Sequence, residues 1–304
     1  MQTLLAAVSS VPPASTGPCG PTWLVTPGIV PTRFDAAVAA GAEVVLLDLE
    51  DSVPTGAKAG ARAAVLAFSG TREREPAGPL LGVRINSVDS HGLVDLAAMA
   101  EKGQWPDLVV VPKIESASDI AAVVRSVRIA AAATKVWALI ESPLGVVALP
   151  GIAHTPGLAG VLFGAADYAA AAGCQMTSRA MWYPRSQLVT AAAAAGIPAV
   201  DSPYFSLDDQ DGLRLDAQEA SELGFTGKVA VHPRQLAVIR QAFAPSQQEL
   251  ATARAVLAAA AGAAGGITTA GGAMVGPPLI EAARAVVRRA SDSRATTSPA
   301  PKAS

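Results

Sequence analysis

The chain has 304 residues, a formal charge of −2 at pH 7 and a hydrophobic share of 51%. A chain of this length can form one large α/β domain or two ordinary ones, and its apolar share is ample for a sizeable core. The near-neutral charge, with no basic stripe and no interleaved aromatic residues, argues against a nucleic-acid partner.

The cysteines and the first residues favour a cytoplasmic protein. The chain has two cysteines, Cys19 in an irregular first segment and Cys174 in a predicted loop, so neither a disulfide framework nor a thiolate metal site is indicated. The start of the chain lacks the basic residues of a secretion signal, and no unbroken run of about 18 apolar residues predicts a membrane span. We therefore expect a cytoplasmic protein without a membrane partner.

The first part of the chain alternates strand and helix patterns. Residues 1–20 contain Pro and Gly too often for a regular element and are expected to be an irregular leader. The elements predicted next are strand Thr22–Val25, helix Thr32–Ala40, strand Glu43–Leu49, helix Lys58–Phe68, a polar loop over 69–79, strand Leu81–Asn86, helix Leu93–Lys102, strand Asp107–Val111 and helix Ile120–Ala133.

The same alternation continues to about residue 231. The elements predicted there are strands Val136–Ile140 and Gly160–Phe163, helix Arg185–Ala195, strand Ile197–Asp201, helix Ala217–Leu223 and strand Lys228–Val231. Beyond them the sequence predicts a helix over 246–262, a glycine-rich hinge over Gly265–Gly276, a helix over Pro277–Ala290 and a disordered tail over 291–304.

Eight short strands alternating with amphipathic helices predict a (β/α)₈ TIM barrel over residues 21–245. A C-terminal helical extension over 246–290 follows it. A doubly wound open sheet is the alternative architecture. No Gly-x-Gly-x-x-Gly stretch follows the first strand, which argues against a dinucleotide-binding version of that sheet.

Two acids follow neighbouring strands and predict a metal site. Glu141 comes directly after the strand ending at Ile140, and Asp167 follows Phe163 after three intervening residues. Side chains at the carboxyl ends of parallel strands emerge where barrel enzymes hold ligands. Oxygen ligands with positions left for water and substrate suit Mg²⁺, with Mn²⁺ as the alternative, better than zinc. Either acid alone could instead cap a neighbouring loop or helix.

Other polar residues also fall at or just past the carboxyl ends of predicted strands. Arg84 is the expected substrate-binding cation, because a guanidinium grips a carboxylate with two parallel bonds. A salt bridge to Asp48 or Glu50 is its alternative role. Lys113 is expected either to neutralise a thioester or phosphate or to form an ion pair. The whole set is Asp48, Glu50, Asp51, Arg84, Asn86, Lys113, Glu141, Asp167 and His232, of which His232 is interpreted as structural.

A series of ordered motifs links the chain to a known family. The motifs are VTPGIVPTRFDAAVAAGAEVVLLDLEDSV, GVRIN, VVVPKIES, ALIESPLGV, GVLFGAADYAA, WYPRSQLVTAAAAAGIPAVDSPY and GFTGKVAVHPRQ. In this order they closely resemble the citrate lyase β-subunit-like proteins of the HpcH/HpaI aldolase superfamily, over roughly residues 20 to 290.

The resemblance implies a fold, a cofactor and a reaction. It implies a (β/α)₈ barrel that assembles into a homotrimer or homohexamer. It implies that Glu141 and Asp167 bind Mg²⁺, that Arg84 binds the substrate carboxylate, and that an acidic cluster surrounds this site. The implied reaction cleaves or forms a carbon–carbon bond in a 3-hydroxyacyl-CoA thioester of the citramalyl, malyl or citryl type. The acidic cluster consists of Asp48, Glu50 and Asp51.

The chain departs from this family near its C-terminus. Lyases of the family commonly carry a segment resembling Gly-x-Met-Val-Asp-x-Pro, whose aspartate serves a neighbouring subunit as acid and base. Here the segment is Gly272-Ala273-Met274-Val275-Gly276-Pro277, and Gly276 has no proton to move. Either another group, such as water held by Asp48 or Glu50, moves the proton, or the reaction differs. The alternatives are a class II 2-keto-acid (pyruvate) aldolase without CoA and a catalytically silent protein that binds CoA or a keto acid.

Overall fold

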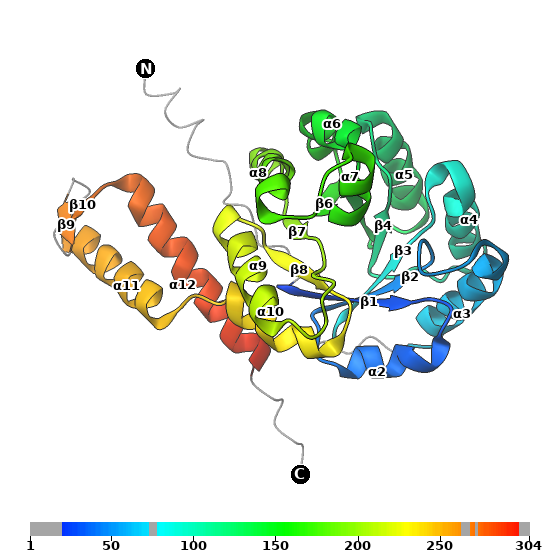
Figure 1. The fold of residues 1–304 in the computed structure, drawn as a ribbon, viewed down its shortest axis with the longest axis horizontal. Helices are drawn as coiled ribbons and strands as arrows, with labels where there is room; N and C mark the ends of the chain where they lie inside the picture. Colours follow the sequence, from blue (N-terminus) through cyan, green and yellow to red (C-terminus); the bar gives the residue numbers. More distant parts are fainter. Residues whose placement is uncertain (1–19, 73–77, 263–267, 271–272, 298–304) are drawn as a thin grey trace, which may run out of the picture. The chain divides into compact units, whose positions relative to one another are not determined.

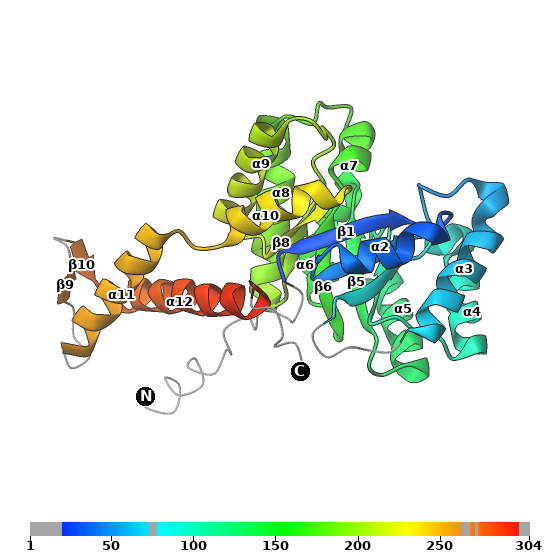
Figure 2. The same cartoon turned by 90° about the horizontal axis from the view of Figure 1, so that it is seen from below.

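A computed structural model of the protein describes residues 20–72, 78–262, 268–270 and 273–297. Eight parallel strands form a closed barrel in chain order, with the last strand paired to the first. Figures 1 and 2 show these strands from two sides. The predicted (β/α)₈ barrel is therefore confirmed. The strands are β1 (Thr22–Pro27), β2 (Val44–Asp48), β3 (Leu80–Arg84), β4 (Leu108–Val111), β5 (Lys135–Ile140), β6 (Leu158–Phe163), β7 (Ala199–Asp201) and β8 (Gly227–Ala230).

Helices follow the strands and surround the barrel (Figure 1). The α-helices are α2 (Phe34–Ala39), α3 (Lys58–Thr71), α4 (Leu93–Lys102), α5 (Ala117–Ala130), α6 (Pro143–Ala153), α7 (Ala165–Ala172), α8 (Ser178–Ala195), α9 (Gln210–Leu223) and α10 (Leu236–Phe243). Short helical turns are η1 (Pro31–Arg33), η2 (Thr55–Ala57), η3 (Val88–Gly92, a π-helix) and η4 (Pro233–Gln235).

Apolar side chains from alternate strand positions fill the barrel interior. Trp23 and Trp137 lie at its centre with their rings edge to face, 4.7 Å between centroids. Neighbouring strands contribute further inward-facing residues, as expected when successive side chains point to opposite faces of a sheet. The interior cluster consists of Trp23, Val44, Leu46, Leu108, Val110, Trp137, Leu139, Leu162, Val200 and Val229.

A buried ionic network joins β7 and β8 to the helices outside them. Lys228 is fully buried, and its Nζ donates to Asp201 Oδ2 at 2.6 Å and to the Ser202 carbonyl at 2.7 Å. Arg185 of α8 donates to the same Asp201 oxygen at 2.9 Å, and Asp216 of α9 lies 2.5 Å from the Lys228 ammonium. Since Val200 and Val229 face the interior, Asp201 and Lys228 face outward.

Three helices of the barrel are absent from the prediction. α6 is apolar around most of its surface and contains Pro150, so its sequence lacks the one-sided pattern of a surface helix. Ser142 nevertheless caps it, accepting a hydrogen bond from the Gly145 amide at 3.1 Å. α7 is mostly alanine and ends at Gly173, whose φ is +65°. No element was predicted for the stretch that α10 occupies.

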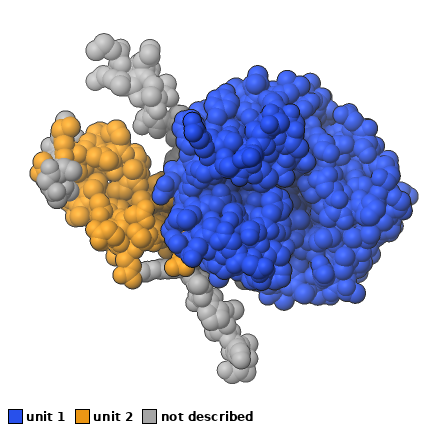
Figure 3. All heavy atoms as spheres, in the orientation of Figure 1, with its two compact units in different colours: residues 1–240 blue, residues 241–304 orange. Residues whose placement is uncertain are grey.

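The chain divides into two compact units, residues 1–240 and 241–304, coloured separately in Figure 3. The second unit contains α11 (Gln247–Gly262), a two-stranded antiparallel sheet of β9 (Thr268–Ala270) and β10 (Ala273–Val275), and α12 (Pro277–Thr297). The predicted glycine-rich hinge thus includes paired strands. α12 extends seven residues beyond the predicted end at Ala290.

Several predicted features lie outside the described residues. They are the leader up to residue 19, part of the polar loop over 69–79, part of the hinge, and residues 298–304 of the tail. In the part of the chain that is described, no helix is both long enough and apolar enough to cross a membrane.

Candidate active site

Three polar residues continue the inward-facing rows at the carboxyl end of the barrel. Because side chains alternate along a strand, the next inward position after the apolar interior is Asp48 on β2, Arg84 on β3 and Glu141 after β5. Asp48 and Arg84 are also partners in the β2–β3 register. These polar residues therefore form the last layer of inward-facing side chains, at the carboxyl end of the barrel, where such barrels bind ligands.

Asp48 and Arg84 form a two-bond ion pair. Arg84 Nε donates to Asp48 Oδ1 at 2.7 Å, and Arg84 Nη2 donates to Asp48 Oδ2 at 2.8 Å. Asp48 is fully buried and also accepts the backbone amides of Glu50 and Ser52, at 2.9 and 3.1 Å. Burial alone would raise the pKa of Asp48, but the bonds and charge of Arg84 outweigh burial and lower it. Asp48 is thus an ionised anchor for Arg84.

Glu50 lies between two cations, which contact it as ion pairs and not as well-aligned hydrogen bonds. Its Oε2 is 3.1 Å from Arg84 Nη1, and its Oε1 is 3.2 Å from Lys113 Nζ. Glu50 is 4% exposed, and neither oxygen has a hydrogen bond of good geometry from the residues described. Burial raises its pKa, and attraction to Arg84 and Lys113 offsets this only in part. The neighbouring Asp51 is half exposed and accepts from Arg84 Nη1 at 3.3 Å.

Lys113 connects the two halves of the site. Its backbone amide donates to Glu141 Oε1 at 2.8 Å, while its half-exposed ammonium faces Glu50. Its φ of +55° lies in the left-handed region, which costs a residue with a side chain about 1–3 kcal/mol. Burial would lower the pKa of Lys113, but the negative charge of Glu50 raises it, so the ammonium stays charged. This strained backbone lets one residue contact Glu141 and Glu50 at once.

Glu141 and Asp167 are close enough to influence each other electrostatically. Glu141 is 3% exposed, whereas Asp167 lies in the first turn of α7 and is exposed. Burial, followed by the charges of Glu50 and Asp167, raises the pKa of Glu141 to about 9. A buried carboxyl group surrounded by like charges is relieved by a cation. The two acids therefore fit a divalent ion that takes its remaining ligands from water and substrate.

Glu141 and Asp167 could hold such an ion only with ligands from outside the protein. Within the described ranges, no group of three or more His, Cys, Asp and Glu side chains is arranged to hold a metal by itself. A site of this kind suits Mg²⁺, which keeps several waters and seldom accepts an all-protein cage. It does not resemble a closed structural zinc site.

The role of Gly164 was missed in the sequence. A Cβ atom placed on Gly164 would lie 2.5 Å from Glu141 Cβ and 2.8 Å from Glu141 Oε2. Gly164 faces Glu141 because Ile140 and Phe163, which precede them, are partners in the β5–β6 register. The only signal in the sequence is a glycine directly after an apolar strand and before Asp167.

Asn86 is held by partners that the sequence did not reveal. The backbone amide and the side-chain Nδ2 of Asn86 both donate to Asp95 Oδ2, each at 2.8 Å. Asp95 is fully buried on α4 and pairs with Arg62 of α3 at 2.6 Å. The signal for Asp95 is an acid within the apolar pattern of a helix. This arrangement fixes the chain just beyond Arg84.

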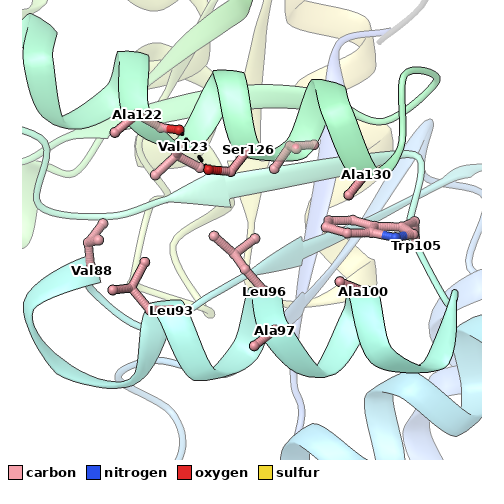
Figure 4. A pocket seen from close by; sticks show the side chains of 11 residues that line it. Val88, Leu93, Leu96, Ala97, Ala100, Trp105, Ala122, Val123, Ser126 and Ala130 are labelled. Atoms are coloured by element: carbon pink, nitrogen blue, oxygen red, sulfur yellow. Dashed lines mark hydrogen bonds between the residues drawn. The ribbon is translucent and has the colours of Figure 1, made fainter.

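His232 does not join this cluster. Its Nδ1 accepts the Arg234 amide at 3.1 Å and caps η4, which agrees with its interpretation as structural. Cys174 is free and exposed between α7 and α8. An apolar cavity of about 300 Å³ lies between α4 and α5, outside the barrel wall (Figure 4). Its lining includes Leu96, Trp105 and Val127 and no charged residue, so it is separate from the polar site.

Comparisons with known proteins connect this geometry to one group of enzymes. Residues 22–233 match the family model described as HpcH/HpaI aldolase/citrate lyase. A citrate lyase subunit beta-like protein of Mycobacterium tuberculosis is 36% identical over 282 residues, which cover 90% of this chain and 97% of that protein. An L-malyl-CoA/beta-methylmalyl-CoA lyase of Cereibacter sphaeroides is 34% identical, covering 81% of this chain and 85% of that enzyme.

A solved structure is similar over nearly the same extent. The crystal structure of the protein CitE from Mycobacterium tuberculosis, in complex with magnesium, acetoacetate and coenzyme A, superposes with a TM-score of 0.77. It is 35% identical to this chain and the match covers 90% of this chain and 98% of that one.

Proposed function

Because this chain belongs to the HpcH/HpaI aldolase/citrate lyase family, we propose that it is a Mg²⁺-dependent carbon–carbon lyase that cleaves a 3-hydroxyacyl-CoA thioester. The observation that carries this proposal is that Arg84 and Glu141 end inward-facing rows at the carboxyl end of the barrel, where the charges of Asp167 and Arg84 both act on Glu141. The substrate is of the citramalyl-, malyl- or citryl-CoA type, and the reaction is a retro-aldol cleavage.

The metal ligands are Glu141 and Asp167, with Mn²⁺ as an alternative ion. The raised pKa of Glu141 supports this assignment, because it reflects negative charge that a cation would balance. Bound Mg²⁺ would act as a Lewis acid that polarises the carbonyl of the keto-acid half. Gly164 leaves the room that the Glu141 carboxyl group occupies.

Arg84 is proposed to bind the carboxylate of the substrate. Three of its five N–H groups donate to Asp48 and Asp51, and the other two are on Nη1, which also lies 3.1 Å from Glu50 Oε2, and on Nη2. Those atoms form the edge that can grip a carboxylate with two bonds. The salt bridge predicted to Asp48 or Glu50 is also present, and its two bonds to Asp48 orient Arg84 for this role. Lys113 is proposed as a second substrate-binding cation.

The CoA thioester is favoured as substrate by the relatives, which include a malyl-CoA lyase and a protein crystallised with coenzyme A. A class II 2-keto-acid aldolase is the second candidate, favoured by Gly276 at the place of the acid/base aspartate. Incubating Mg²⁺-loaded protein with citramalyl-CoA, malyl-CoA, and pyruvate plus aldehydes separates the two. If the protein turns over none of these substrates, the third hypothesis remains, a catalytically silent protein that binds CoA or a keto acid.

The metal site has its own test. Replacing Glu141 by Ala is expected to abolish Mg²⁺-dependent binding of oxaloacetate in calorimetry, while the thermal transition stays near its original temperature. Unchanged oxaloacetate binding would refute the assignment of Glu141. Assembly into a homotrimer or homohexamer is part of the same proposal, and analytical ultracentrifugation of the full chain measures it.

A further inference from the structure

Asp48 and Glu50 are two residues apart in the chain and are both buried. They differ in the hydrogen bonds that their carboxyl groups accept. Both oxygens of Asp48 accept hydrogen bonds, from Arg84 and from two backbone amides. A carboxylate with this many partners is stabilised in its ionised form and is poorly suited to accept a proton. The lowered pKa of Asp48 also indicates that its carboxyl group is ionised. Asp48 is therefore a positioning residue for Arg84.

Glu50 has the properties that Asp48 lacks. Its two oxygens are buried without a hydrogen bond of good geometry, although Arg84 and Lys113 lie within 3.2 Å. A buried carboxyl group without such bonds is uncommon, because desolvation is offset only when the group finds partners. Glu50 also lies against the cation proposed to bind the substrate carboxylate. Its carboxyl group therefore lies beside the residue that would hold the substrate.

The chain needs a proton-transfer group of its own. The segment of β10 and the residue after it reads Met274-Val275-Gly276, so the position that follows β10 offers no side chain. Among the acids that border Arg84, Asp48 is fully bonded and Asp51 is half exposed and bonded to Arg84. Glu50 is the carboxyl group whose oxygens have ion-pair contacts with Arg84 and Lys113 but no hydrogen bond of good geometry.

We propose that Glu50 is the acid and base of the reaction, an inference that rests on the proposed lyase function. Glu50 takes the proton of the 3-hydroxyl group as the bond between C2 and C3 breaks. The electrons of that O–H bond form the new carbonyl at C3, and the electrons of the broken bond pass to C2 as the thioester enolate. Glu50 then returns the same proton to C2, which gives the acyl thioester. One substrate yields two products with no change in oxidation state overall.

Lys113 controls access to Glu50 in this proposal. Both Glu50 oxygens are shielded from solvent in the free protein. Of the two cations beside them, the Arg84 side chain is 16% exposed and the Lys113 side chain is 52% exposed, so Lys113 is the one with room to move. A negatively charged substrate group attracts the Lys113 ammonium and uncovers Glu50.

Hydrogen exchange tests this role without requiring cleavage. Full-length protein with Mg²⁺ is incubated in D₂O with acetyl-CoA, whose methyl carbon corresponds to C2 of the thioester enolate, and loss of the methyl proton signal is followed by NMR. Glu50→Gln, which keeps the shape but cannot move a proton, is expected to lower the exchange rate at least about 100-fold. Calorimetry of Mg²⁺ and oxaloacetate binding to the same variant is expected to stay within about threefold of the parent.

Two further variants complete the experiment. Glu50→Asp keeps a carboxyl group and is expected to exchange faster than Glu50→Gln; equal loss in both contradicts the proposal. Glu115→Gln is the matched control, because Glu115 is an exposed glutamate two residues after Lys113 that bonds Ser142. It is expected to change neither readout, and melting curves of all variants report folding.

The outcomes separate this inference from the proposed function. A parent protein that binds no Mg²⁺ or keto acid and turns over none of the probes refutes the lyase function and the role of Glu50 together. An active parent whose Glu50→Gln variant exchanges equally fast refutes the role of Glu50 alone. A Glu50→Gln variant that loses Mg²⁺ binding also overturns it, because Glu50 would then serve the metal and not the proton.

Discussion

Gly164 lies directly opposite Glu141. Because Gly164 has no side chain, the Glu141 carboxyl group can occupy the space beside it. A Cβ atom there would approach Glu141 Cβ to 2.5 Å and Oε2 to 2.8 Å, which is closer than real contacts allow. The backbone of Gly164 has φ −109° and ψ 82°, so a positive φ is not the reason for glycine here. The reason is steric room for Glu141.

Gly164→Ala is therefore expected to weaken Mg²⁺ binding by at least about 10-fold, because Glu141 must leave its position. Isothermal calorimetry, or Mn²⁺ binding followed by electron paramagnetic resonance, measures the change. Shortening the acid in Gly164→Ala/Glu141→Asp is expected to recover part of the affinity. Gly60→Ala is the matched control. Gly60 is an exposed residue of α3 where an added Cβ meets nothing within 4 Å, so the affinity for Mg²⁺ is expected to stay unchanged. Normal Mg²⁺ binding by Gly164→Ala would exclude the steric explanation.

The contrast between Glu141 and Gly164 shows what could be predicted from sequence. An acid at the end of an apolar run indicates the carboxyl end of a strand. The positions of Glu141 and Asp48 were therefore predicted from their local sequence pattern. The role of Gly164 depends on which residue of β5 it faces, and that follows from the register of two strands. Register is set by packing of the whole barrel and leaves no local trace in one strand.

The same limit applies to the helices and to the partners of Arg84. α4 has a one-sided apolar pattern and was predicted with its exact ends, Leu93 and Lys102, whereas α6 lacks such a pattern and was missed. The ion pair of Arg84 with Asp48 was one of two roles considered, and the structure contains it. Choosing between these roles from sequence was impossible, since one guanidinium can serve both.

Glu141→Gln is expected to be more stable than the parent in the metal-free protein, increasingly so as the pH rises. Burial and the charges of Glu50 and Asp167 raise the pKa of Glu141 from its ordinary 4.5 to about 9. Between these values the folded parent holds a proton that the unfolded chain has lost, so the free energy of unfolding falls as the pH rises. Glutamine carries no such proton.

Urea unfolding at pH 5 and pH 8 measures this difference. The advantage of Glu141→Gln is expected to grow by roughly 1–3 kcal/mol between the two. Saturating Mg²⁺ is expected to stabilise the parent at pH 8 and to have little effect on the variant. Glu115→Gln, at an exposed position, is the control. Parallel stability profiles for parent and Glu141→Gln would mean that Glu141 is ionised in the free protein.

Arg84→Lys is expected to lose keto-acid binding and some stability, although it keeps the charge. An ammonium group cannot reproduce the two parallel bonds to Asp48, so each buried Asp48 oxygen loses its charged donor and keeps only a backbone amide. We expect the free energy of unfolding to fall by ~1–3 kcal/mol. Thermal melting and oxaloacetate binding in the presence of Mg²⁺ measure the two effects. Retained binding with Lys at this position would show that charge alone suffices.

Lys228→Met is expected to destabilise the barrel without touching the site. Lys228 and Arg185 share Asp201, and both cations are buried between β7, β8, α8 and α9. Removing one partner of such a network leaves uncompensated buried charge and costs about 3–5 kcal/mol. Lys228→Met/Asp201→Asn removes charge from both sides and is expected to cost less than the single change, which denaturant unfolding tests directly. Arg214→Met breaks an exposed ion pair with Asp211 and serves as the control, with an expected change below about 0.5 kcal/mol. A Lys228→Met protein as stable as this control would show that the network contributes nothing to holding α8 and α9 on the barrel.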